Sequence, residues 1–364
     1  MIINLAAILA TLDPNTGFRL ANQARVPANY LWNLFLPEIP RGDYQAKSGT
    51  MTVRTTMAGM VGMDSPYPEG GFVELSTFSE ETTKIANRVR LSEKAQRDLQ
   101  QFLSEIALAS GDVSRAATLE ALNFYDKLVV QAHLDTFEYL RSRAIQGTID
   151  WTFNKKRLLV DYGIPTANKG PQRTGNDHYG GSASKFWTDI SFLRKRLKYN
   201  VRALVAHDDT IDLARNNPVN SMAVISEDNG SITFKKVNTY GDWTKDASDT
   251  VTLIKYGMEG EIYDEVNPGL LKQIKMMPTG VITGLGNNSG TRFVVGAGST
   301  PPPENALGYT HIGPTVEGGG ARGRWGDVRV PEGEPWAFEG RGVTNGLPVI
   351  EAPDKIAHVY TDMS

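Results

Sequence analysis

The fold is decided by residues 139–162, which read YLRSRAIQGTIDWTFNKKRLLVDY. The first part has the pattern of the last turns of an amphipathic helix, and Gly147 is a typical helix stop. Residues 151–153 and 157–162 then predict two strands, with a turn at 154–156. The stretch therefore predicts a long helix that runs directly into a β-hairpin.

The helix that ends here is predicted to begin near residue 112. Its apolar residues recur at three- and four-residue spacings and form much of one stripe: Leu122, Tyr125, Val129, Ala132, Phe137 and Leu140. A helix of roughly 35 residues would be about 50 Å long, which exceeds the needs of a compact domain. Burial of each large side chain contributes roughly 1.5–3 kcal/mol, so we expect the helix to lie across a sheet or against a partner. A shorter helix is predicted before it, over residues 92–108.

The segment upstream of the helices is extended and punctuated by proline. Large apolar side chains between residues 30 and 35 stand among Pro27, Pro37 and Pro40, with little room for regular structure. Residues 50–57 and 72–77 flank a cluster of Pro and Gly, which predicts a long β-hairpin. A lone two-stranded hairpin is marginal in water, so we expect this one to pack on the body or on another subunit. An ordinary surface hairpin is the alternative.

Residues 166–184 are polar and glycine-rich, which predicts a linker or mobile loop before a second domain. That domain is predicted to begin with a helix over 185–199, an apolar strand over 200–207 and a short helix capped by Asp208 or Asp209. Further strands are predicted over 232–237, 250–256, 261–263, 280–285 and 292–295.

The C-terminal part changes character. Low hydrophobicity with abundant Pro and Gly predicts surface loops over residues 299–346. Residues 358–360 predict a final strand, which we place in the sheet of the first domain. The body as a whole is mixed α+β.

Composition sets outer bounds. The 364 residues exceed the size at which one core usually stops growing, so two domains are expected. The 38 basic and 41 acidic residues give a net charge of −3, which argues against a dedicated nucleic-acid binder but leaves non-specific DNA contact open. The chain has no cysteine, which excludes disulfides and thiolate metal sites. No apolar run is long enough to span a bilayer, so no membrane association is expected.

Motifs for catalysis or cofactor binding are weak. The chain has no Gly-x-x-x-x-Gly-Lys phosphate loop, and residues 284–289 lack the third glycine of a dinucleotide-binding turn. No serine lies in a Gly-x-Ser-x-Gly elbow. His207, Asp208 and Asp209 are adjacent, but helix capping accounts for the aspartates better than metal binding. We therefore predict no catalytic residue, cofactor or metal site.

Two basic clusters are candidates for phosphate contact: Lys155, Lys156 and Arg157 at the predicted hairpin turn, and Arg194, Lys195, Arg196 and Lys198 at the end of a predicted helix. Cations near a helix C-terminus also complement the helix dipole. We favour that structural role for the second cluster and keep the hairpin residues as DNA-facing candidates.

The order of arm, long hairpin, long helix and short strand pair resembles the lambda-type major capsid proteins of tailed bacteriophages. In that family a helix is likewise followed by a glycine and then by a strand, a turn and a second strand, as in residues 139–162. Residues 187–216 and the GVITG sequence at 280–284 resemble the family's second domain. The resemblance covers most of the chain.

The resemblance implies the α+β shell fold of tailed-phage and herpesvirus capsids, which is the Hong Kong 97-like fold. It divides the chain into an N-terminal arm over 1–44, an extended loop over 45–91, a peripheral domain over 92–184 with a spine helix over about 112–146, an axial domain over 185–325, and loops with a return strand over 326–364.

The function that the resemblance implies is that of a major capsid protein, assembled in the bacterial cytoplasm as hexamers and pentamers into the icosahedral virion head around double-stranded DNA. A portal and a separate scaffolding protein are expected partners. Residues 299–346 are either an insertion or a docking surface for a decoration protein. Arm and loop would overlap neighbouring subunits through seven apolar residues: Trp32, Phe35, Met51, Val53, Met57, Phe72 and Leu75.

Two alternatives stay open. An encapsulin-like nanocompartment shares the fold and would hold cargo protein in place of DNA. A β-rich hydrolase or glycan-binding protein requires the glycine-rich loops around His178 and His311 to converge on one pocket with carboxylates.

Overall fold

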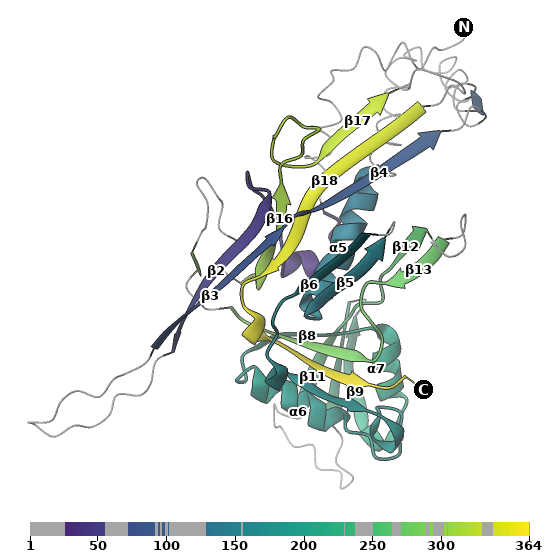
Figure 1. Cartoon of the computed structure of the whole chain (residues 1–364). Helices are drawn as coiled ribbons and strands as arrows, with labels where there is room; N and C mark the ends of the chain where they lie inside the picture. Colours follow the sequence, from purple (N-terminus) through teal and green to yellow (C-terminus); the bar gives the residue numbers. More distant parts are fainter. Residues whose placement is uncertain are drawn as a thin grey trace, which may run out of the picture.

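The computed structural model describes residues 26–54, 72–91, 129–153, 156–228, 230–236, 250–263, 271–288, 292–293, 302–303, 305–329 and 338–363, together with the single positions 94, 97, 98 and 101. Figure 1 shows three parts: a hairpin that projects from one side, a middle part around helix α5 (Gln131–Ile145), and a sheet with two helices at the other end.

Helix α5 ends where the sequence predicts. Gly147 follows it with a φ of 103°, a conformation that glycine adopts without steric cost. Strands β5 (Thr148–Phe153) and β6 (Lys156–Asp161) come next and pair as an antiparallel hairpin. The predicted passage from helix to hairpin is confirmed. The predicted start of the spine helix near residue 112 lies outside the described residues, and the structure describes only isolated positions of the helix over 92–108.

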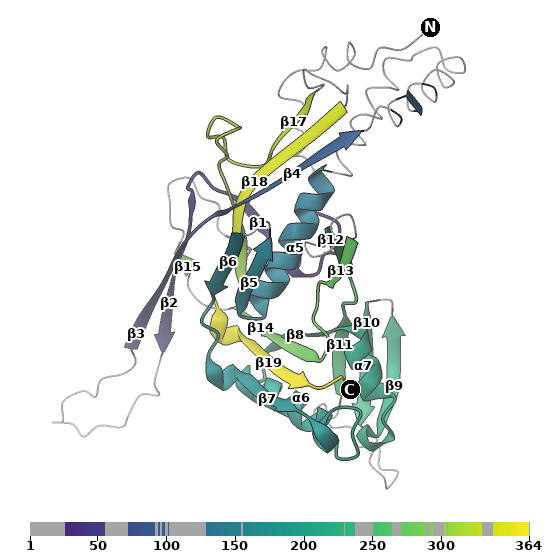
Figure 2. The ribbon, with the colours of Figure 1, turned by 45° about the vertical axis from the view of Figure 1, so that its right-hand side comes forward.

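The projecting hairpin consists of β2 (Gln45–Arg54) and β3 (Phe72–Glu81), which pair antiparallel along their whole length. Strand β15 (Arg292–Phe293) pairs with the other edge of β2. Figures 1 and 2 both show the hairpin extending away from the rest of the chain. The hairpin prediction is confirmed, and its strands reach further toward the body than the sequence pattern indicates.

A five-stranded sheet lies on one side of α5. It comprises β1 (Glu38–Pro40), β4 (Thr83–Leu91), β16 (Gly308–Gly313), β17 (Trp325–Arg329) and β18 (Phe338–Ile350). Strand β18 is the central strand of this sheet, because its first part pairs with β4 and β17 and its last part with β16. Helix α5 packs against β18.

This sheet corrects the prediction of surface loops over residues 299–346. Strand β16 is buried at every position. The local hydrophobicity is low because glycines stand where two backbones approach closely. A Cβ atom on Gly308 would lie 2.0 Å from the carbonyl oxygen of Val349.

The second sheet has seven strands in the order β7 (Lys169–Arg173), β19 (Ile356–Thr361), β14 (Val281–Gly286), β8 (Val201–Ala206), β11 (Thr250–Lys255), β10 (Ser231–Lys236) and β9 (Met222–Asp228). Helices α6 (Phe186–Arg196) and α7 (Asp208–Arg215) share one apolar cluster with this sheet. The predicted helix, strand and short helix of the second domain are confirmed.

Three details of this part differ from the sequence prediction. The final strand β19 pairs with β14 and β7 in the seven-stranded sheet, not with the first domain's sheet. The predicted linker over 166–184 contains β7 and the fully buried Tyr179. The cap of α7 is His207, whose Nδ1 accepts a 3.1 Å hydrogen bond from the N–H of Asp209. Asp208 and Asp209 lie inside the first turn.

The remaining elements are short. Strands β12 (Glu259–Tyr263) and β13 (Leu271–Lys275) form a separate two-stranded sheet. Single 3-10 turns lie at η1 (Trp32–Leu34), η3 (Thr166–Asn168), η4 (Gly175–Asp177), η5 (Pro218–Asn220) and η7 (Pro353–Lys355). Within the described ranges, no helix combines the length and apolar character that crossing a bilayer requires.

Candidate functional site

The arm lies in the core of its own chain. The side chain of Trp32 is 0% exposed and that of Phe35 is 3% exposed. The Trp32 ring packs edge-on against Tyr256, with 5.7 Å between ring centroids. These two side chains have no surface left for a neighbouring subunit, contrary to the expectation from the sequence. A segment with little regular structure is buried here because α5 and the neighbouring strands of the same chain cover it.

Two buried charged residues on α5 hold the arm in place. The Oε1 atom of Glu138 accepts hydrogen bonds from the N–H of Trp32 at 2.7 Å and from the hydroxyl of Tyr256 at 2.8 Å. Arg141 donates to the other oxygen of Glu138 at 3.1 Å and to Glu38 of β1 at 2.7 Å. The carboxylate and the guanidinium together connect the arm, the helix and the end of β11.

The same network extends into the five-stranded sheet. Arg141 Nε donates to the hydroxyl of Thr310 in β16 at 2.8 Å, and Arg324 pairs with Glu38. Burial raises the pKa of Glu138 despite the nearby Arg141. Burial also acts to raise the pKa of Glu38, but the charges of Arg324 and Arg141 outweigh it and hold that pKa below its ordinary value. The projecting hairpin begins at Gln45, shortly after β1, and we call this end of β2 the root of the hairpin. The network thereby fixes the root to α5 through β1.

The hairpin itself is described through its backbone. The side chains of Met51, Val53, Phe72 and Leu75 lie outside the described part of the structure, as does all of Met57. Among the described residues, β3 pairs with β2 alone, so its outer edge carries backbone groups with no strand partner. The five apolar residues therefore stay predicted contacts.

The turn of the β5–β6 hairpin gives less support to a DNA contact than the sequence suggests. Arg157 donates through Nε and one terminal nitrogen to the two carboxylate oxygens of Asp150, both at 2.7 Å. This hydrogen bonding also holds the pKa of Asp150 below its ordinary value. Lys155 lies outside the described residues, and for Lys156 only the backbone is described. The described cation of this cluster is thus already paired.

The two histidines needed by the hydrolase alternative lie in different places. His311 is buried in β16, with Nε2 2.8 Å from the carbonyl oxygen of Asp43. His178 precedes α6, and its Nδ1 accepts a hydrogen bond from the N–H of Gly180 at 3.1 Å. His311 lies in the five-stranded sheet and His178 in the connection between β7 and α6, so they do not form the shared pocket that this alternative requires. Among the described residues, no three His, Asp or Glu side chains gather into a potential metal site.

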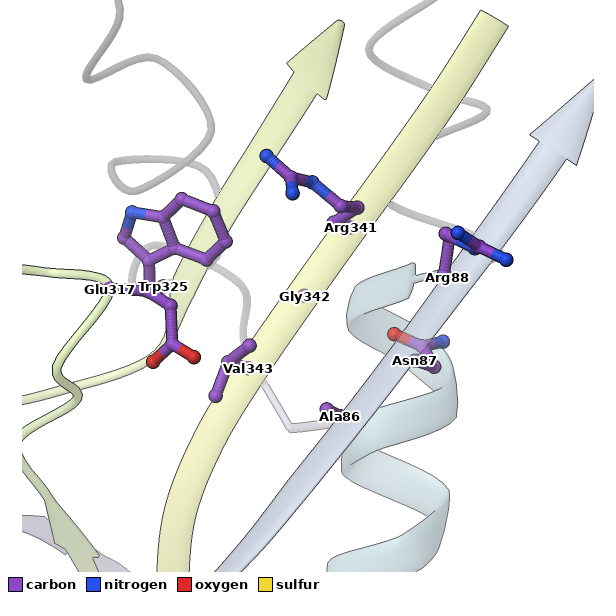
Figure 3. A pocket seen from close by; sticks show the side chains of 8 residues that line it. All are labelled: Ala86, Asn87, Arg88, Glu317, Trp325, Arg341, Gly342 and Val343. Carbon is purple, nitrogen blue, oxygen red and sulfur yellow. The ribbon is translucent and has the colours of Figure 1, made fainter. Parts of the chain in front are cut away.

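A hollow of about 290 Å³ opens on the face of the five-stranded sheet formed by β4, β17 and β18. Figure 3 shows Trp325 of β17 on one side of it, Arg88 of β4 on the other, and Arg341, Gly342 and Val343 of β18 between them. The sequence gives no sign of this hollow, because the residues of β17 and most of β18 have the composition of surface loops.

Two of the charged side chains that line the hollow, Arg341 and Glu317, form ion pairs. Arg341 forms an ion pair with Asp327, and Glu317 forms one with Lys84. The guanidinium of Arg341 also lies over the Trp325 ring, 5.7 Å from its centroid. Glu317, the carboxylate that lines the hollow, is thus engaged by a lysine.

Comparisons with known proteins give a result at the level of the fold. No family model and no curated protein sequence matches the chain. Among solved structures, a protein assigned as the capsid protein of a prophage in E. coli CFT073 is similar with a TM-score of 0.55. The two are 10% identical, over 96% of this chain and 99% of that one.

Two further structures are similar with lower scores. A phage-related protein from Bordetella bronchiseptica RB50 has a TM-score of 0.46 and 10% identity, over 94% of each chain. The holo-SrpI encapsulin complex from Synechococcus elongatus PCC 7942 has a TM-score of 0.39 and 10% identity, over 100% of this chain and 97% of that one. Because both scores lie below 0.5, the comparison rests on the prophage protein. The chain shares the α+β fold of that phage capsid protein, as the resemblance in its sequence predicts.

Proposed function

We propose that the chain is the major capsid protein of a tailed bacteriophage. In this proposal it assembles as hexamers and pentamers into the icosahedral head that encloses double-stranded DNA. The observation that carries the proposal is the β2–β3 hairpin, which projects clear of the body on a fixed root (Figures 1 and 2). The fold shared with a prophage capsid protein supports it.

A projecting ribbon of this kind is costly for a protein that works alone. In the described part of the chain the short β15 pairs only with Gly49 and Thr50, and beyond it the ribbon has two strands. A two-stranded ribbon is marginally stable in water, and an uncovered strand edge invites association. Both problems disappear when the ribbon lies on a neighbouring copy. Around a rotation axis each copy gives its hairpin to the next one, and the ring closes because the same contact repeats. The apolar residues Met51, Val53, Met57, Phe72 and Leu75 supply that contact in our proposal.

The buried network on α5 gives this assembly a mechanical basis. Glu38 is held by Arg141 and Arg324, and the hairpin begins shortly after β1. A fixed root means that little conformational freedom is lost when the hairpin meets a neighbour, so weak contacts suffice. We propose no catalytic step. A portal, a separate scaffolding protein and a decoration protein are the further partners, with assembly in the host cytoplasm.

The direct test is negative-stain electron microscopy and sedimentation of the full chain, expressed alone and with a neighbouring scaffolding gene product. Rings of five or six copies or closed angular shells are the expected result. A persistent monomer or dimer under both conditions would contradict the proposal. Shells that contain a protein cargo and no DNA would point to an encapsulin-like compartment instead.

Deletion of residues 50–77 tests the hairpin. The deletion joins Gly49 to Phe78, and Phe78 is opposite Ser48 in the ribbon, so the joined chain ends already lie close together. The shortened chain is expected to be soluble and to form no shells. Its helices should be intact, which an unchanged helical circular dichroism signal would show. The matched control is Arg157→Gln, on an exposed hairpin of the same chain, which is expected to assemble. Normal shells from the deletion would refute the assigned role of the hairpin.

A further inference from the structure

The C-terminal end of α6 presents a cluster of exposed cations next to an exposed aromatic ring. Lys195, Arg196 and Lys198 are exposed, and Tyr199 is 74% exposed, among the highest values for a large hydrophobic side chain. The four residues lie within five positions, at the end of the helix and in the turn that leads to β8. They are defined here as the α6 cluster.

Several basic side chains elsewhere in the chain form ion pairs, and the cations of the α6 cluster differ from these. Arg157, Arg173 and Lys275 each pair with a carboxylate. In the described part of the chain, Lys195, Arg196 and Lys198 form no ion pair; the guanidinium of Arg196 lies over the Phe192 ring, 5.2 Å from its centroid. Attraction to the C-terminal carbonyl groups of α6 accounts for some of this charge. It does not account for an aromatic side chain held out among the cations.

The turn holds Tyr199 in that position at a conformational cost. Lys198 has a φ of 51° and Tyr199 a φ of 60°, and both lie in the left-handed region that glycine favours. The N–H of Tyr199 donates to the carbonyl oxygen of Arg194 at 2.7 Å, which closes the end of the helix. Glycine would make the same hydrogen bond without strain. The strained tyrosine is therefore better explained by its side chain than by its backbone.

We propose that the α6 cluster binds the phosphate backbone of double-stranded DNA. Lysine and arginine neutralise phosphates, and a tyrosine hydroxyl donates to a phosphate oxygen. An acidic surface of another protein would offer the same charge, but lysine is depleted at protein interfaces, and two of the three cations are lysine. At the β5–β6 turn the described cation, Arg157, is paired with Asp150, whereas Lys195, Arg196 and Lys198 have no ion pair among the described residues, which favours the α6 cluster as a DNA contact. If the proposed function holds, this end of α6 faces the inside of the shell.

The test uses the full unassembled chain and a short fluorescein-labelled DNA duplex of mixed sequence, followed by anisotropy as the salt concentration is raised. Three phosphate contacts predict a slope of log affinity against log salt of about −2.7, which is roughly a 40-fold loss between about 50 and 200 mM salt. The combined variant Lys195→Gln, Arg196→Gln, Lys198→Gln is expected to lose most of this affinity and of its salt dependence.

The control removes the same net charge elsewhere, with Arg157→Gln, Lys272→Gln and Arg322→Gln at exposed positions. It is expected to bind like the unchanged chain. Equal affinity and equal slope for the cluster variant and the control would overturn the inference. So would a cluster variant that binds DNA normally but fails to assemble, because that result assigns the cluster to a contact between subunits.

Tyr199→Gly separates binding from folding. Removal of the strain is expected to raise the melting temperature, while loss of the phosphate hydrogen bond weakens DNA binding about fivefold. A variant that is more stable and binds DNA unchanged would overturn the role of the tyrosine. Since this assay uses unassembled subunits, DNA binding without shells would contradict the proposed function alone, and shells without cluster-dependent binding would contradict this inference alone.

Discussion

The backbone N–H of Trp32 donates a 2.7 Å hydrogen bond to the carboxylate of Glu138, and both residues are completely buried. The bond joins positions 106 residues apart, so the arm and the middle of α5 are parts of one core. The same carboxylate also receives Arg141 and Tyr256. A carboxylate with three donors is stable in a buried place that would be costly for it alone. The hairpin root is held by the same arrangement, because Arg141 also bonds to Glu38 of β1.

Arg141→Met is expected to destabilise the chain strongly. The substitution leaves Glu138 and Glu38 without their shared cation in a buried site, and breaking a buried pair in this way typically costs about 3–5 kcal/mol. The free energy of unfolding in urea measures the loss. Arg157→Met is the control, because its partner Asp150 is exposed and the change should be much smaller. Similar losses for the two variants would show that the α5 network does not hold the arm.

Trp32→Ala tests whether the arm belongs to the core of its own chain. Loss of a fully buried tryptophan is expected to lower the free energy of unfolding by about 3–5 kcal/mol in the unassembled subunit. Leu34 lies in the same 3-10 turn but is 60% exposed, so Leu34→Ala should change stability little. Equal stability of the Trp32 variant and the unchanged subunit would mean that this ring is buried only by a neighbour.

The elements that the sequence predicts well are those with local signals. The stripe on α5, the stop at Gly147 and the strand pair after it are all written in residues close together in the chain. The same holds for α6, β8 and α7, and for the hairpin whose two strands flank a Pro and Gly cluster. Each of these elements shows its period or its turn residues within a single short window.

The predictions that the structure corrects went wrong because they depend on contacts between residues remote in sequence. Strand β19 enters the seven-stranded sheet because β14 and β7 flank it, and both are remote in sequence. Strand β16 looked like a loop because Gly308 and Gly313 make it appear polar, although the glycines serve close backbone contact. Trp32 is buried by apolar residues remote in sequence, and its N–H bonds to a carboxylate on α5, which no local pattern reveals. That the α6 cluster forms no ion pair with the described residues likewise follows only from where the carboxylates lie.

Gly308→Ala tests the close backbone contact in the five-stranded sheet. The added Cβ would lie 2.0 Å from the carbonyl oxygen of Val349, and a backbone atom moves only with the strand. We expect misfolding or a large fall in melting temperature. Gly42→Ala is the matched control, because a Cβ there meets no atom within 4 Å. A Gly308 variant as stable as the Gly42 variant would show that the two strands separate readily.

The buried histidines predict a loss of stability in mild acid. His133 lies between the hydroxyl of Thr344 at 2.7 Å and the amide oxygen of Asn87 at 2.9 Å. Burial, with the nearby charge of Arg324, lowers the pKa of His133 to about 3, and burial lowers that of His358 to about 4. In the unfolded chain both side chains titrate near their ordinary value of 6.5.

Below the pKa of 6.5 the unfolded chain therefore binds protons that the folded chain refuses, so acid favours unfolding. Each histidine should lower the free energy of unfolding by up to about 1.4 kcal/mol per pH unit as the pH falls from 6.5 toward 4, and its contribution is regained above 6.5. Urea unfolding of the subunit at several pH values between about 7 and 5 measures this slope.

His133→Gln should remove one histidine's contribution to the pH dependence of the free energy of unfolding. Thr344→Val is the control, because it breaks one of the two hydrogen bonds of His133 without removing a titrating group, and should lower stability equally at every pH. The same slope for the His133 variant and the unchanged chain would mean that His133 accepts a proton in the folded state.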